Sequence, residues 1–139
     1  MAELQNFFDK YTTLSHEELL AAARKSMALA LVHLRKLKAG EENELLSAVI
    51  ATALGADDTV SDDELAFITD LLSSELTRSR LTAIAAKFGT DEMRRRLDRV
   101  TDSLPKEGKS ALCTLTLCIL AADRRITPKE TDFLLRLMR

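Results

Sequence analysis

The chain of 139 residues has no Trp, a single Tyr, four Gly and two Pro. Such a small number of turn-forming and aromatic residues is not typical of a β-sheet protein, and the composition as a whole is not that of a disordered tail. Ala, Leu, Glu, Lys and Arg are abundant instead, and 46% of the residues are hydrophobic, which is enough for a real core in a chain of this length. The composition therefore predicts a compact all-α domain.

Long hydrophobic runs are also missing. The longest apolar stretch, residues 111–122, contains Thr114 and Thr116, whereas a membrane-spanning helix needs about 20 predominantly apolar residues. The first five residues, Met1 to Gln5, show neither the basic start nor the apolar stretch of a signal peptide. We expect a soluble, cytoplasmic protein.

Metal-binding and catalytic side chains are few. Cys113 and Cys118 are five residues apart, which is not a metal-ligand spacing, so we expect reduced core thiols. His16 and His33 have no Cys or Glu at ligand spacing, and surface or helix-packing roles are expected for both. The chain has no Gly-rich phosphate loop, nucleophile elbow or Glu-x-x-His motif. We therefore predict that it is not an enzyme and uses no organic cofactor.

Charge is distributed unevenly along the chain. Residues 41–75 contain ten acidic residues and no Lys or Arg, whereas basic residues predominate after position 76. The strongest basic cluster is 94–96 with Arg99, but it lacks stacking aromatics and has Glu92 and Asp98 among its arginines. We predict a solvated, ion-paired helix there and no nucleic-acid partner.

Hydrophobic periodicity and capping signals predict seven or eight helices and no strand, in one domain spanning 1–139. A short leading helix is followed by the capping box Ser15-x-x-Glu18, which begins a long helix that Gly40 terminates. Thr90 or Asp91 is expected to cap a later helix that ends before Pro105.

One stretch of sequence occurs twice. Residues 56–64 (Ala-Asp-Asp-Thr-Val-Ser-Asp-Asp-Glu) return 66 positions later at 122–130 (Ala-Asp-Arg-Arg-Ile-Thr-Pro-Lys-Glu). Repeat one covers about 41–75 and repeat two about 106–139, and each predicts a helical hairpin. Because duplicated hairpins usually fold together about a pseudo-twofold axis, we expect a compact bundle with that internal repeat.

In each repeat an Asp closes one helix and a Glu lies seven residues later, at the third position of the next helix. These residues are Asp57 and Glu64 in the first copy, and Asp123 and Glu130 in the second. Two such pairs would supply the carboxylate oxygens that Ca²⁺, Mg²⁺ or Mn²⁺ prefer. The simpler alternative is that Ser61-x-x-Glu64 and its counterpart only cap helices, and the sequence leaves it open.

A calcium-binding EF-hand is excluded. If Asp57 were loop position 1, position 6 would be Asp62 where Gly is required, and position 12 would be Ile68 where Glu is required.

Each repeat consists of an apolar helix, a short motif and a second hydrophobic helix. This order resembles the tellurite-resistance TerB-like family over about Leu19 to Met138. The family motif is Ala-Asp-Gly-x-(Val/Ile)-(Ser/Thr)-x-x-Glu. The resemblance implies a seven-helix bundle, a divalent-metal site and a place in membrane-associated stress-response or tellurite-resistance systems. By position, it implies the ligands Asp57, Glu64, Asp123 and Glu130. Asp58 replaces the motif Gly in the first copy and adds a candidate ligand, whereas Arg124 replaces it in the second and would compete with a cation.

Two functions are thus expected. The first is a non-enzymatic TerB-like module that binds a divalent cation and works with other proteins, including membrane-associated ones. The alternative is a metal-free helical protein-interaction domain that uses its acidic and basic faces. The sequence does not indicate the oligomeric state.

Overall fold

A computed structural model describes residues 2–54, 62–72, 77–123, 131, 134, 135, 137 and 138. These residues form seven helices and no strand: α1 (Ala2–Thr12), α2 (His16–Leu37), α3 (Glu42–Leu54), α4 (Asp62–Leu72), α5 (Arg78–Phe88), α6 (Asp91–Ser103) and α7 (Lys106–Asp123). Residues 131, 134, 135 and 137 also have helical backbone. The all-α class and the predicted number of helices are confirmed for this part of the chain.

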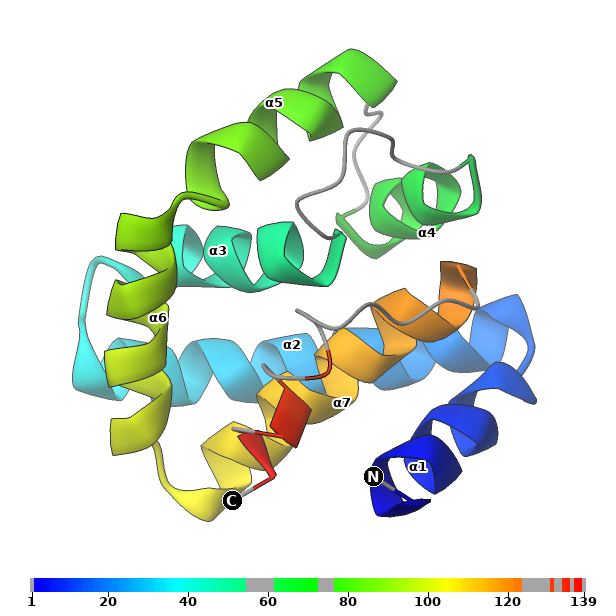
Figure 1. The fold of residues 1–139 in the computed structure, drawn as a ribbon, viewed down its shortest axis with the longest axis horizontal. Coiled ribbons are helices and arrows are strands. Elements are labelled where there is room, and N and C mark those ends of the chain that lie inside the picture. The colour runs from blue at the N-terminus through cyan, green and yellow to red at the C-terminus, as the bar shows by residue number, and fades with distance from the viewer. Residues whose placement is uncertain are drawn as a thin grey trace.

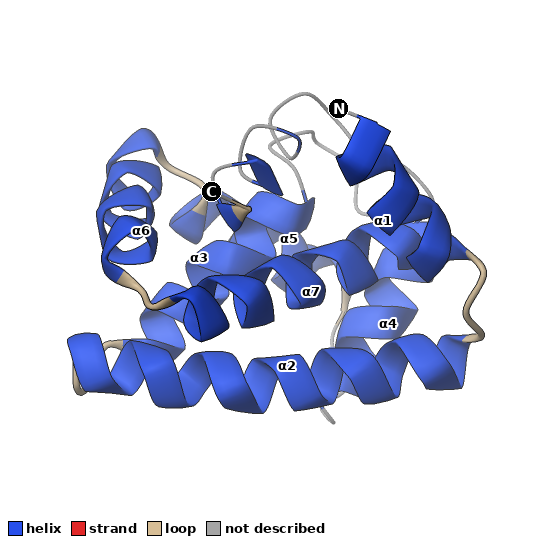
Figure 2. Cartoon of the chain, turned by 90° about the horizontal axis from the view of Figure 1, so that it is seen from below, coloured by secondary structure: helices blue, strands red, loops and turns tan. Residues whose placement is uncertain are grey.

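Helices α2 and α7 form the centre of the molecule (Figure 1). They lie side by side and share the most extensive contact of any helix pair, as the second view also shows (Figure 2). Helix α1 packs on α7, α3 packs on α5 and α7, and α4 packs on α2 and α7. Helix α6 runs across one end of α2 and α3 (Figure 1).

The helix boundaries follow the capping signals of the sequence. At the start of α2 the Ser15 hydroxyl accepts the Glu18 backbone N–H at 3.2 Å, and the Glu18 carboxylate accepts the Ser15 N–H at 2.9 Å. Hydrogen bonding from Ser15 to the carboxylate, first from its backbone N–H and then from its side chain, holds the pKa of the Glu18 carboxyl below its usual value. Gly40 has a φ of +88°, a left-handed conformation that favours glycine after a helix, and the Thr90 hydroxyl caps α6. The predicted capping box and both predicted termini are therefore confirmed.

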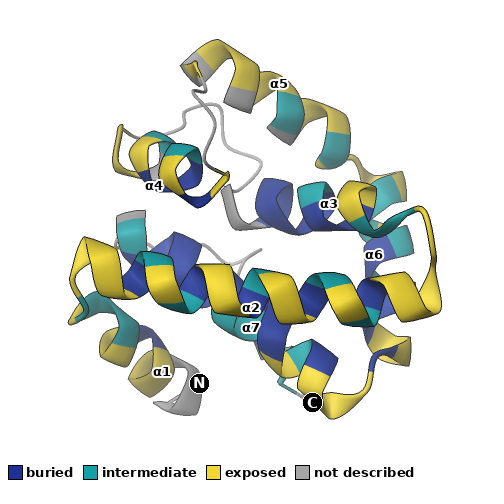
Figure 3. Ribbon diagram, turned by 180° about the vertical axis from the view of Figure 1, so that it is seen from behind, coloured by how far each residue is buried: buried dark blue, intermediate teal, exposed yellow. Residues whose placement is uncertain are grey.

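The core consists mainly of aliphatic side chains from the helices around α7. Its fully buried members include Leu34, Leu45, Ile68, Leu112 and Ile119. A smaller cluster of Phe8, Leu117, Leu120 and Leu134 lies between α1, α7 and the C-terminal residues. The opposite face of α2 remains exposed, including Leu29 and Val32, and forms a stripe along the outside of the molecule (Figure 3).

Candidate functional site

The predicted metal ligands fall largely outside the described residues. Helix α3 ends at Leu54, so Asp57 and Asp58 lie beyond the described part, as does Glu130. Glu64 and Asp123 belong to α4 and α7, but their side chains are not among those described. Whether these carboxylates come together therefore stays a prediction.

Two of the motif acids have described helical backbone, since Glu64 belongs to α4 and Asp123 to the last described turn of α7. The residues that precede α4 and follow α7 lie outside the described part of the chain, so the predicted cap at Glu64 and the closing role of Asp123 stay predictions.

Burial also repeats at the spacing of 66 residues. Residues 45–52 and 111–118 have the same burial class at every matched position except one, where Ala48 is buried and Thr114 is half-buried. In the second helix of each hairpin, four of the five described pairs also match, with Ile68 and Leu134 both buried, whereas Leu72 is exposed and Met138 half-buried. The two segments therefore meet the core with nearly the same pattern of burial.

The two histidines take part in helix packing. His16 Nε2 lies 2.8 Å from Asp70 Oδ2, its ring meets Phe67 edge-on, and it thereby joins α2 to α4. His33 is mostly buried, with Nε2 3.9 Å from a carboxylate oxygen of Glu107. Among the described side chains, no three His, Cys, Asp or Glu gather closely enough to hold a metal ion.

Part of the acidic segment 41–75 is paired within the chain. The Arg96 guanidinium of α6 forms ion pairs with Glu41 and Glu44, the latter at 3.0 Å, and Arg35 Nε donates to Glu42 at 3.2 Å. Hydrogen bonding, first from its own backbone N–H and then from Arg35, lowers the pKa of the Glu42 carboxyl despite some burial. The predicted ion-paired character of the basic helix is confirmed for Arg96, and these acids are already engaged with the chain itself.

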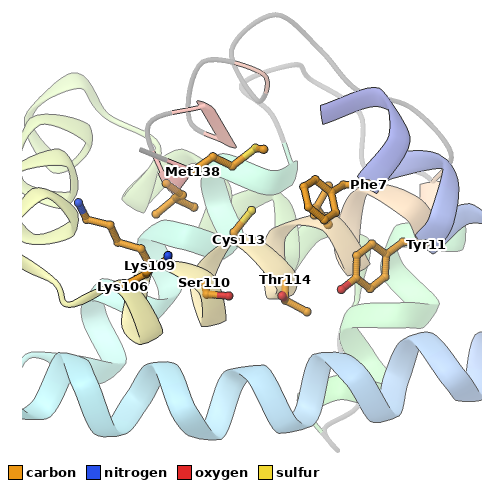
Figure 4. Close-up of a pocket in the computed structure, with 10 residues that line it drawn as sticks. Phe7, Tyr11, Lys106, Lys109, Ser110, Cys113, Thr114 and Met138 are labelled. Atoms are coloured by element: carbon orange, nitrogen blue, oxygen red, sulfur yellow. The ribbon is translucent and has the colours of Figure 1, made fainter. Parts of the chain in front are cut away.

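A structural feature that the sequence analysis missed is a cavity of about 560 Å³ beside α7. Its walls come from α1, the outer face of α7 and the C-terminal residues Leu137 and Met138. In Figure 4, Lys106 and Lys109 lie toward one end and Phe7 and Tyr11 toward the other, with Ser110, Cys113 and Thr114 between them. The cavity therefore has a cationic end and an aromatic end.

A second, wider groove lies on the other side of the same α7 residues. It is lined by Lys25 and Leu29 of α2 and shares Lys106, Ser110 and Thr114 with the first cavity. The sequence contains a signal for this region, since Lys106, Lys109, Ser110 and Cys113 recur at helical spacing on an otherwise apolar helix. Only the position of α1 shows that this stripe borders a cavity.

The thiol in the cavity is not a reactive group. Burial raises the pKa of Cys113 to about 11 and that of Cys118, in the core, to about 12. Both are free cysteines and remain protonated at neutral pH, so neither supplies a nucleophilic thiolate. The predicted core position is confirmed for Cys118, whereas Cys113 is half-buried and lines the cavity.

Comparisons with known proteins return no assignment: no family model matches this chain, and neither curated proteins nor solved structures include a significant match. Of the described helices, none is long and apolar enough to cross a membrane.

Proposed function

We propose that this chain is a non-enzymatic, TerB-like binding module in which a divalent cation joins the two helical hairpins. The observation that carries the proposal is the agreement in burial between residues 45–52 and 111–118. Two segments that meet the core alike favour a pseudo-twofold arrangement of the hairpins. Such an arrangement would bring the turns after α3 and α7 toward each other.

The donor set fits a hard cation. Asp57, Asp58, Glu64, Asp123 and Glu130 offer only carboxylate oxygens, which suit Ca²⁺, Mg²⁺ and Mn²⁺ better than softer transition metals. A bound cation would link the end of the first helix of each hairpin to the beginning of the second. The physiological setting suggested by the resemblance, a stress or tellurite response with protein partners near membranes, belongs to the same proposal.

Calorimetric titration of metal-stripped protein with Ca²⁺, Mg²⁺, Mn²⁺ and Zn²⁺ at physiological salt tests the site. We expect saturable binding of one of the three hard cations and a rise in melting temperature, because a ligand of the native state stabilises it by mass action. The Asp57→Asn/Asp123→Asn variant should lose both effects while its helical circular dichroism remains.

The matched control is Glu17→Gln/Glu92→Gln, which removes two exposed acids from the first turns of other helices. This variant should bind the cation as the original chain does. If no heat of cation binding is measured, or if it is the same in the motif variant and in the control, the motif acids only cap helices.

The metal-free interaction domain remains the second candidate, and one observation favours it. Leu29 and Val32 are 49% and 50% exposed on the outer face of α2, next to basic residues of the same helix. Since Glu41 and Glu44 are paired with Arg96, this α2 face is more available for docking than the start of the acidic segment. Partner binding that persists in chelator and is lost in Leu29→Ser/Val32→Ser would support this candidate over the cation module.

A further inference from the structure

We propose that the cavity between α1 and α7 binds a small anionic amphiphile, a molecule with an apolar chain and one carboxylate group. The cavity volume of about 560 Å³ lies within the range of small-molecule sites, which are mostly apolar with a few placed polar groups. The carboxylate would lie at Lys106 and Lys109, and the apolar chain would extend toward Phe7 and Tyr11 (Figure 4).

The charge at one end of the cavity selects an anion. Among the described residues, neither Lys106 nor Lys109 has an acidic partner within ion-pair distance, whereas Arg35 and Arg96 are both paired. Both lysines belong to the first turn of α7, where the unpaired amides of the helix add a partial positive charge. The preceding Pro105 has no side-chain acceptor for those amides. A carboxylate would therefore meet two ammonium groups and the positive end of a helix.

The remaining walls select an apolar chain. Leu117, Leu137 and Met138 line the cavity together with Phe7, which is 41% exposed although it is a large aromatic residue. A bound chain would cover this exposed ring and gain the free energy of removing apolar surface from water. The hydroxyls of Ser110 and Thr114 lie between the two ends and can hydrogen-bond to the head group.

The dimensions favour a small molecule over a docked helix. A helix in a groove needs a continuous row of apolar anchors along several turns. Here the apolar wall ends at Lys106 and Lys109, and the second groove continues with Lys25 and Glu107. A short chain with a single charged end matches the cavity, whereas a long amphipathic partner does not.

The chain carries its own reporter for this site, because its single tyrosine, Tyr11, lines the cavity and Trp is absent. Tyrosine fluorescence would be titrated with decanoate below its micelle concentration, and in parallel with decanol and decyltrimethylammonium. We expect a saturable change with decanoate and binding at least about tenfold weaker with the neutral and cationic compounds, as lost charge-assisted hydrogen bonds require.

The variant Lys106→Gln/Lys109→Gln should weaken decanoate binding about tenfold with little change in melting temperature, since neither lysine has an acidic partner among the described side chains. The control Lys36→Gln/Lys38→Gln alters two exposed lysines at the C-terminal end of α2 that do not line the cavity, and it should bind decanoate normally. Equal affinity for the three compounds, or equal affinity in both variants, would overturn the proposal.

Other occupants give different results. A fluorescence change that depends on protein concentration without ligand would identify a second copy of the chain and overturn the proposal. Saturable binding of an acidic amphipathic peptide, with no binding of decanoate, would also overturn the proposal and would indicate a protein ligand. The lysine variants leave every motif acid intact, so failure here is distinct from failure of the cation site.

Discussion

Helices α3 and α7 contain matched segments of the sequence repeat, yet their outer faces meet different surroundings. On the inner side, Leu46 and Leu112, 66 positions apart, are both buried, and so are Val49 and Leu115. On the outer side, Glu44 of α3 is paired with Arg96, whereas its counterpart Ser110 lines the cavity beside α1. The two helices therefore share the burial of their core-facing positions, whereas their outward-facing positions have different neighbours.

The largest effects should come from the shared face. Leu46→Ala and Leu112→Ala should each reduce the free energy of unfolding by about 2–5 kcal/mol, because each deletes a buried side chain and leaves a cavity. Chemical denaturation measures both values. The control Leu29→Ala, at a side chain 49% exposed, should cost less than about 0.5 kcal/mol. A Leu112→Ala cost as small as that of the control would break the equivalence of the two segments.

A thiol labelling experiment separates the two faces of α7 itself. At pH 8, Cys113 should react with iodoacetamide about a hundredfold more slowly than a free cysteine, because burial raises its pKa from 9.0 to about 11 and thereby lowers the thiolate fraction. Its rate should increase as the pH rises toward 11. Cys118, fully buried in the core, should stay unlabelled in the native protein.

Mass spectrometry of Cys113→Ser and Cys118→Ser variants assigns the labelled thiol. Labelling of Cys118 ahead of Cys113 would contradict the assignment of Cys113 to the cavity face.

The smallest effect concerns the polar contact that distinguishes α3. Arg96→Ala should cost up to about 1 kcal/mol in unfolding free energy, since ion pairs of a partly exposed arginine are screened by solvent. Arg99→Ala, at an exposed position of the same helix, should cost less. The difference in cost between Arg96→Ala and Arg99→Ala should shrink at high salt, because salt screens the ion pairs. Equal costs at low salt would show that the ion pairs with Glu41 and Glu44 do not stabilise α3.

The helices themselves were largely predictable because their signals are local. The Ser15–Glu18 box, Gly40 and Thr90 mark helix ends within a few residues, and the structure confirms each of them. The helix-packing role predicted for His16 also holds, although its partner Asp70 is 54 positions away and could not be identified from spacing. The five predicted metal ligands remain untested, because their side chains lie outside the described residues.

The sequence by itself determined the class of fold, since periodicity, caps and composition act within one or two turns of a helix. It also indicated two helical runs 66 positions apart, because apolar residues predominate in both 45–52 and 111–118. Only the tertiary structure decided what covers the other face of each helix: α6 brings Arg96 to Glu44, and α1 leaves a cavity above Ser110. Those neighbours come from distant parts of the chain, and local propensities carry no information about which distant helix will pack there.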